Sequence, residues 1–203
     1  MVDDRDSQEV ALHGRGGQGV KTAGDLVVYA LSAVGYRVNG QPLYGGERMG
    51  APVAYFIRFK RSAAPIDDRS LVRRPDVMLV FDATMLAATP RMVESLAPGG
   101  VLLLNSRRTA AELAHLGCTV ATVWASRIAK ECGLVRGNVP IVGTVMVGAF
   151  ARLTGLVSLS TLEACLEKVI GDMAQDRIEG NVTGLRRGYD AVDRLAWRAV
   201  ERV

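Results

Sequence analysis

The chain has 203 residues, 49% of them hydrophobic and 23% charged, which is the balance of a globular protein that can bury a core without staples. Its formal net charge is +4, but the basic residues are scattered, and the concentrated patch typical of nucleic-acid binding is missing. The three cysteines lie far apart without a CxxC pair, which argues against a disulfide framework and against a metal or iron–sulfur site held by this chain alone: Cys118, Cys132 and Cys165.

Strand and helix patterns alternate along most of the chain. Residues 77–81 and 101–104 are apolar throughout, as is typical of strands buried on both faces of a parallel sheet. Helical spacing of apolar residues, with glycine or proline stops, predicts helices between the strands. In chain order we predict strands at residues 10–13, 36–39, 53–59, 77–81, 101–104 and 119–123, and helices at 20–34, 85–96, 109–116, 125–132, 142–153, 160–173 and 181–203.

The opening strand–helix–strand pattern predicts an α/β fold, with an open, mostly parallel sheet and helices on both faces. Residues from about 156 to 203 are expected to be helical and to pack on this domain or on partner subunits. Ser160 and Glu163 have the spacing of a capping box. Without a linker or repeat, residues 1–203 are expected to form a single domain. The polar, acidic first nine residues and the lack of a membrane-length apolar run favour a cytoplasmic protein without membrane contact.

A glycine-rich loop, HGRGGQGVKT, joins the first predicted strand to the first predicted helix. Glycines let the backbone approach a phosphate closely, and the free N–H groups at the start of a helix bind anions. The alternative, a tight turn that only packs the helix against the sheet, stays open. The candidate ligand-binding residues are Gly14, Arg15, Gly16, Gly17, Gln18, Gly19 and Lys21.

Two familiar nucleotide sites fit this loop poorly. A dinucleotide site requires an acidic residue at the end of the second strand, about 20 residues further on. Residues 37–40 carry no carboxylate. A Walker A loop requires Lys directly after its last glycine, whereas Val20 separates Gly19 from Lys21. The sequence therefore disfavours both an NAD site and a P-loop nucleotide site.

Polar residues elsewhere add weaker candidates. Glu47 and Arg48 lie in the middle of a glycine- and proline-rich loop, either as a solvated turn or as a polar rim facing a ligand or partner. Asp82 and Asn105 each follow a predicted buried strand, at the edge where open α/β sheets bind ligands. For Asp82 we favour capping of the next helix. Asn105 has the same two interpretations and is kept as a candidate. No catalytic or metal-binding residue is expected on this chain, and His13 is expected to be structural.

The two loops together resemble one family. G-R-G-G-Q-G-V-x-T-A opening a helix, followed by x-G-G-E-R-x-G-A-P-V, resembles the gamma subunit of 2-oxoacid:ferredoxin oxidoreductases and the equivalent domain of single-chain pyruvate:ferredoxin oxidoreductases. The resemblance extends over about residues 9–170. It departs from the family at Gly143-Thr144, where an Asn-Thr pair is common, and at Tyr44-Gly45-Gly46, which hints at a subfamily with a distinct substrate.

The resemblance implies an assembly in which thiamine diphosphate and Mg²⁺ decarboxylate a 2-oxoacid, 4Fe–4S clusters carry electrons and coenzyme A accepts the acyl group. This chain lacks the thiamine motif and the cluster cysteines, so these cofactors are expected on alpha, beta and ferredoxin-like delta subunits. The implied acceptor is ferredoxin, or NAD through a flavin subunit. This chain is expected to be structural and to share the coenzyme A site. A free-standing nucleotide- or coenzyme A-binding module, or a pure scaffold, stays an alternative.

Overall fold

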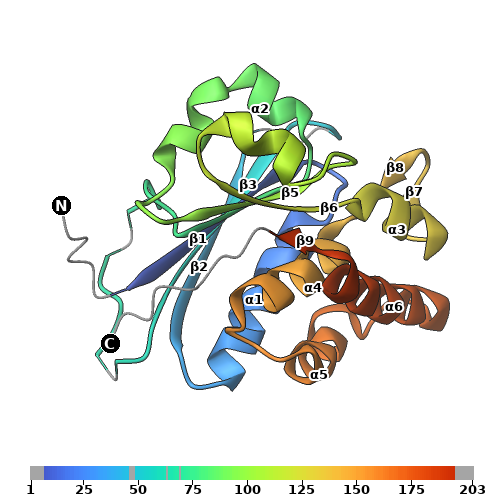
Figure 1. Ribbon diagram of the computed structural model, residues 1–203. Helices are drawn as coiled ribbons and strands as arrows, with labels where there is room; N and C mark the ends of the chain where they lie inside the picture. Colours follow the sequence, from blue (N-terminus) through green and yellow to red (C-terminus); the bar gives the residue numbers. More distant parts are fainter. Residues whose placement is uncertain (1–6, 46–48, 63, 69, 195–203) are drawn as a thin grey trace.

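The computed structural model describes residues 7–45, 49–62, 64–68 and 70–194 (Figure 1). A seven-stranded sheet forms its centre, in the order β2-β3-β1-β4-β5-β6-β9. The strands of this sheet are β1 (Gln8–Arg15), β2 (Arg37–Tyr44), β3 (Pro52–Lys60), β4 (Val77–Val80), β5 (Val101–Asn105), β6 (Thr119–Val123) and β9 (Asp193–Arg194). The helices are α1 (Val20–Ala33), α2 (Thr84–Ala88), α3 (Ala125–Glu131), α4 (Gly143–Thr154), α5 (Leu159–Ile170), α6 (Gln175–Ala191) and the 3-10 helices η1 (Pro90–Ser95) and η2 (Ala111–Leu116).

The central strands β1, β4, β5 and β6 pair in parallel, so their carboxyl ends all lie at one edge of the sheet. The predicted α/β fold with a mostly parallel sheet is confirmed. The expected strand–helix–strand opening differs in one respect: β2 is not next to β1. Instead β3 lies between them and pairs antiparallel with both. The short connection from β2 to β3 explains this, because adjacent strands joined by a short loop pair as a hairpin.

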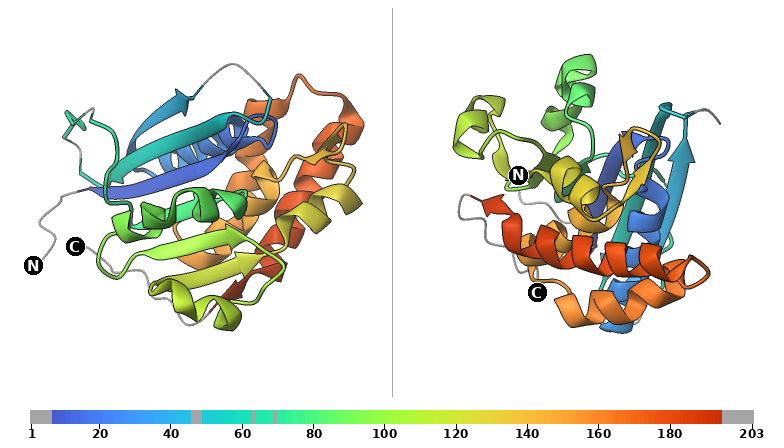
Figure 2. Two further views of the ribbon diagram at one scale, coloured as in Figure 1. Left: turned by 90° about the horizontal axis from the view of Figure 1, so that it is seen from above. Right: turned by 90° about the vertical axis from the view of Figure 1, so that its right-hand side faces the viewer.

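Helices cover the two faces of the sheet unequally (Figure 2). Because side chains alternate along a strand, Leu79 and Leu103 join a large core with α1, α4, α5 and α6. Met78 and Leu102 point the other way and join a smaller core with α2, η1 and η2. Each fully buried Leu stabilises the fold by about 1.5–3 kcal/mol. The smaller layer covers β4–β6, whereas among the described residues none of its helices lies over β1–β3 (Figure 2).

The C-terminal helices pack on this domain itself. Helix α6 crosses α4 with almost no space between the two backbones. A Cβ atom on Gly148 would overlap the carbonyl oxygen of Leu185, and one on Gly188 would overlap that of Val145. Helix α5 packs on α1 and α6. No helix in the described part of the chain is both long and apolar enough to cross a bilayer.

Several element predictions need correction. The predicted helix at 85–96 is broken into α2 and η1 because Pro90 lacks an N–H and cannot continue a helix. Residues 109–116 form only the 3-10 helix η2. The cap of α5 is Ser158, which accepts from Thr161 N at 3.0 Å, and not Ser160. Helix α6 begins at Gln175 and ends at Ala191, before β9, and residues 195–203 lie outside the described part.

Candidate functional site

The glycine loop follows β1 and opens α1. Gly17 and Gly19 have φ angles of 95° and 85°, in the left-handed region that side chains other than glycine rarely adopt. Gly14 is constrained by packing, because a Cβ atom there would lie 2.6 Å from the Val20 side chain and 3.0 Å from Phe81. The loop therefore needs glycine for its own conformation, apart from any ligand.

The start of α1 has no side-chain cap. Gly19 is the N-cap residue, and Ala23 N makes the first intrahelical bond, to Gly19 O at 2.9 Å. The N–H groups of Val20, Lys21 and Thr22 therefore have no acceptor within the helix. Together with the helix dipole they act as about half a positive charge. This end of α1 suits an anion.

Neighbouring segments hold the loop in place. Gly16 N donates to Ala51 O at 2.8 Å, and Gly50 N donates to Gly16 O at 3.1 Å. On the other side Val142 N donates to Gln18 O at 3.1 Å. The buried side chain of Gln18 accepts from Arg15 N at 2.8 Å. Gln18 thus braces the loop from beneath and does not face the cavity described next.

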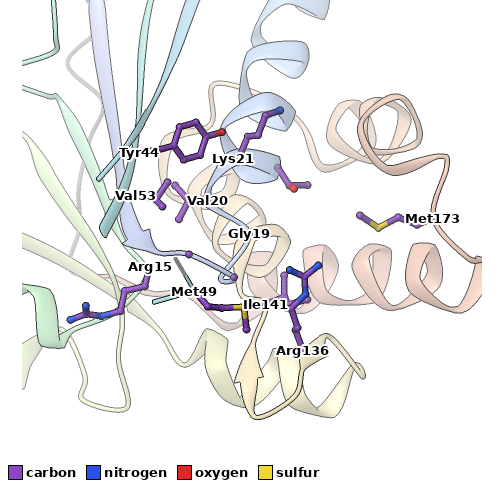
Figure 3. Close-up of a pocket in the computed structure, with 13 residues that line it drawn as sticks. Arg15, Gly19, Val20, Lys21, Tyr44, Met49, Val53, Arg136, Ile141 and Met173 are labelled. Carbon is purple, nitrogen blue, oxygen red and sulfur yellow. The ribbon is translucent and has the colours of Figure 1, made fainter. Parts of the chain in front are cut away.

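A cavity of about 640 Å³ lies in front of the loop (Figure 3). The glycine loop and the first turn of α1 form one wall. The rest of the lining is mostly apolar, and three of its side chains are largely exposed: Tyr44 at 53%, Met49 at 60% and Met173 at 46%. The cavity thus brings backbone N–H groups and apolar side chains together. It is lined by Arg15, Gly16, Gly17, Gly19, Val20, Lys21, Thr22, Tyr44, Met49, Val53, Arg136, Ile141 and Met173.

Arg15 turns its guanidinium away from the cavity (Figure 3). Its Nε donates to Asp82 Oδ2 at 2.7 Å, and its Nη2 donates to Thr84 Oγ1 at 3.1 Å. Asp82 also accepts from Thr84 N at 3.0 Å, but the N-cap residue of α2 is Ala83, so the expected capping by Asp82 is wrong in position by one residue. Burial opposes the charge of Asp82, but hydrogen bonds from Thr84 and Arg15 outweigh it and lower the pKa of Asp82. Arg15 therefore braces the carboxyl edge of the sheet.

Lys21 is also engaged, although it lies at the cavity. Its Nζ donates to Asp25 Oδ2 at 2.6 Å, and this hydrogen bond raises the pKa of Lys21. The Tyr55 hydroxyl donates to Asp25 Oδ1 at 2.9 Å. Burial, followed by the bond to Asp25, raises the pKa of Tyr55. Asp25 thus holds Lys21 on the outer side of the first turns of α1.

Arg136 was not predicted from the sequence. It lies in a small hairpin of β7 (Val135–Arg136) and β8 (Val139–Pro140), and lines the cavity beside the glycine loop (Figure 3). Its side chain is exposed, and within the described residues it has no acidic partner. Two-residue strands leave no periodic signal, so nothing in the sequence places this arginine near Gly19.

Asn105 and His13 do not line the cavity. Asn105 Nδ2 donates to Phe81 O and to Ser126 Oγ, both at 2.8 Å, and its Oδ1 accepts from Ser126 N at 3.1 Å. It ties the end of β5 to its neighbours. Burial lowers the pKa of His13 to about 4. The His13 ring packs edge-on against the ring of Phe56 on β3, with 5.8 Å between the centroids. Glu47 and Arg48 lie outside the described residues.

No metal site is formed by the described residues, among which no three His, Cys, Asp or Glu side chains gather as ligands. All three cysteines are free, and Cys165 is buried. The uncapped start of α1 and the cavity in front of it suit the binding of an anion at the N–H groups, with a less polar portion of the ligand against the apolar side chains of the lining.

Comparison with known sequences places these features in a wider group. Residues 9–191 match the family described as pyruvate ferredoxin/flavodoxin oxidoreductase. The chain is 37% identical over 188 residues to pyruvate synthase subunit PorC of Thermotoga maritima, covering 91% of this chain and 94% of that protein. It is 32% identical over 191 residues to the pyruvate/ketoisovalerate oxidoreductases common subunit gamma of Pyrococcus furiosus, covering 91% and 97%.

Solved structures with a similar fold lead to the same family. The crystal structure of the T. maritima pyruvate oxidoreductase subunit PORC matches with a TM-score of 0.76 and 33% identity, over 93% of this chain and 98% of that one. The 2-oxoglutarate:ferredoxin oxidoreductase of Magnetococcus marinus, solved with 2-oxoglutarate, coenzyme A and succinyl-CoA bound, matches with a TM-score of 0.72. It is 19% identical over 92% of this chain and 31% of that longer chain, a likeness of fold alone.

Proposed function

The chain belongs to the pyruvate ferredoxin/flavodoxin oxidoreductase family and is a gamma-type subunit of a multi-subunit 2-oxoacid oxidoreductase, and we propose that its own contribution is to bind the phosphates of coenzyme A. One observation carries this proposal: the uncapped start of α1 opens into a cavity of about 640 Å³. The glycine loop presents backbone there without a side chain in the way.

The lining of the cavity suits a ligand of this kind. A phosphate at the N–H groups of Val20, Lys21 and Thr22 would receive charge-assisted hydrogen bonds. Lys21 and Arg136 would add positive charge from the two sides. Met49 and Met173 are flexible apolar side chains that adapt to a less polar arm of the same molecule. In this role the chain holds and orients coenzyme A, while the acyl transfer itself takes place on groups that it does not carry.

The remaining cofactors are proposed for partner subunits. We place thiamine diphosphate and Mg²⁺ on alpha and beta chains, and 4Fe–4S clusters on a ferredoxin-like delta chain. The P. furiosus relative is named as a subunit common to pyruvate and ketoisovalerate oxidoreductases. Its name supports the view that other chains select the 2-oxoacid. Ferredoxin, or NAD through a flavin subunit, stays our prediction for the acceptor, and a cytoplasmic location stays a prediction too.

Arg136→Ala in the assembled complex tests the coenzyme A site. Loss of one charge-assisted contact of about 1.5 kcal/mol raises the KM for coenzyme A roughly tenfold. The KM for the 2-oxoacid and kcat at saturating coenzyme A should stay unchanged. Lys130→Ala is the matched control, because Lys130 is an exposed cation on α3 that does not line the cavity.

An unchanged KM for coenzyme A in folded Arg136→Ala, and in the double variant with Lys21→Ala, would favour the scaffold alternative. Calorimetry with coenzyme A on the isolated chain tests the remaining alternative. Tight binding by the chain alone, without companion subunits in the purified protein, would favour a free-standing module.

A further inference from the structure

An exposed tryptophan flanked by two arginines lies at the carboxyl edge of the sheet. Trp124 follows β6, and 39% of its surface is exposed. The guanidinium carbon of Arg107 lies 5.2 Å from the centroid of the Trp124 ring, and that of Arg127 lies 5.3 Å from it. Both distances are typical of cation–π contacts. We name these three residues the Arg-Trp-Arg cluster; none of them lines the cavity at the glycine loop.

The base of the cluster is fixed by hydrogen bonds between neighbouring strand ends. Asn105 bonds Ser126 through both its amide nitrogen and its amide oxygen, and also reaches the backbone after β4. Ser106 N donates to Val123 O at 3.1 Å. Trp124 is thus held between two braced positions. A preorganised group loses little conformational entropy when a partner covers it.

The cluster carries more positive charge than its surroundings neutralise. Arg127 pairs with Glu131 at 2.7 Å, but Glu131 is shared with Arg187. The Nη2 of Arg108 donates to the carbonyl oxygen of Glu112. Arg107 has no acidic partner among the residues that the structure describes. An unpaired guanidinium on a half-exposed indole therefore faces outward.

Tryptophan and arginine are the side chains most enriched at the energetic centre of protein interfaces. We infer that the Arg-Trp-Arg cluster docks an acidic surface of another subunit of the same complex. The inference rests on the multi-subunit role stated above. Charge complementarity selects the occupant, since a carboxylate of the partner would supply the counter-charge that Arg107 lacks.

The position of the cluster fits this role. Because β1 and β6 run parallel, the cluster lies at the same edge of the sheet as the glycine loop. A partner seated on Trp124 would therefore lie beside the edge at which the cavity opens. The docking surface and the proposed ligand site are then neighbours without sharing a residue.

The test measures the affinity of this chain for the rest of its complex, by sedimentation over a series of NaCl concentrations. Trp124→Ala is expected to weaken association about thirtyfold, the effect of losing one central anchor. Arg107→Lys should be near wild type, Arg107→Gln weaker and Arg107→Glu weakest. Association of Arg107→Gln should also depend less on salt.

Arg61→Glu is the matched control. Its guanidinium carbon lies 4.3 Å from the centroid of the Tyr36 ring, in the same kind of pair at the opposite edge of the sheet. It should associate like wild type. A second readout is Trp124 fluorescence in a Trp197→Phe background, where assembly should shift the emission to shorter wavelength because the indole loses water.

Four outcomes would overturn the inference. In the first, folded Trp124→Ala and Arg107→Glu associate at full affinity. In the second, Arg61→Glu weakens association as much as Arg107→Glu does. In the third, the sign of the charge at position 107 has no effect on association, which would make the partner surface apolar. The fourth outcome concerns a duplex DNA probe: if the wild-type chain binds it and Trp124→Ala and Arg107→Glu lose that binding while they keep full subunit association, the inference is wrong. If Trp124→Ala does not fold, Trp124→Phe with the Arg107 series decides. A wild-type chain that joins no larger chains would instead contradict the multi-subunit role.

Discussion

Substitution of Glu9 should show how much one buried ion pair contributes to the free energy of unfolding. Arg58 and Glu9 are 7% and 6% exposed, and Glu9 Oε1 accepts from Arg58 Nε at 2.8 Å and lies 2.7 Å from Nη2. Arg58 also donates from Nη1 to Asp68 O at 2.6 Å. In Glu9→Ala the buried guanidinium of Arg58 would keep only the backbone carbonyl oxygens of Asp68 and Ser70 and the mostly exposed carboxylate of Asp68 as partners.

Breaking a buried pair from one side costs about 3–5 kcal/mol, because the remaining charge is no longer compensated. Arg58→Met with Glu9→Leu removes both charges, and is expected to cost much less than the sum of the single changes. Urea unfolding of the wild type, Glu9→Leu, Arg58→Met and the double variant gives the coupling energy directly. Glu163→Ala, which breaks a surface pair with Arg186, is the control and should leave the midpoint nearly unchanged. A loss below about 1 kcal/mol in Glu9→Ala, or strict additivity in the double variant, would refute the reasoning.

Two further predictions concern packing and pH. Gly188→Ala should lower the free energy of unfolding by about 2 kcal/mol, because its Cβ would overlap the carbonyl oxygen of Val145. Thermal unfolding measures the loss, and Gln175→Ala, at an exposed position of the same helix, is the control. His13 stays neutral in the folded chain because burial lowers its pKa from 6.5 to about 4, so its contribution to stability is complete above pH 6.5 and is lost as pH falls toward 4. In His13→Gln the pH dependence of unfolding across that window should flatten, and an unchanged slope would contradict the assignment.

The sequence predicts the elements whose signals are local. Residues 77–81 and 101–104 are apolar runs, and they form the buried strands β4 and β5. The insertion of β3 beside β1 joins residues far apart in the chain, and periodicity carries no information about such pairing. The break at Pro90 had a local signal, because a proline inside an apolar helical pattern ends the helix at that point.

The side chains of the site show the same division. Gly17 and Gly19 were recognised because the backbone conformation of the loop needs glycine, which is a local property. The direction of the Arg15 guanidinium depends on Asp82, which lies 67 residues further along the chain. Sequence spacing therefore marks Arg15 as a ligand-binding cation, whereas folding makes it a brace between the glycine loop and β4.

This use of Arg15 leaves backbone groups to meet the anion that we propose. If Arg15 turned toward the cavity, Asp82 would lose the guanidinium that helps to keep it ionised beside the start of α2. The N–H groups of Val20 and Thr22, in contrast, have no acceptor within the helix, so no intrahelical hydrogen bond has to break when they bind an anion. An anion there gains hydrogen bonds while the brace at the carboxyl edge stays intact, so the edge can keep one rigid shape while a partner docks on it and a ligand enters beside it.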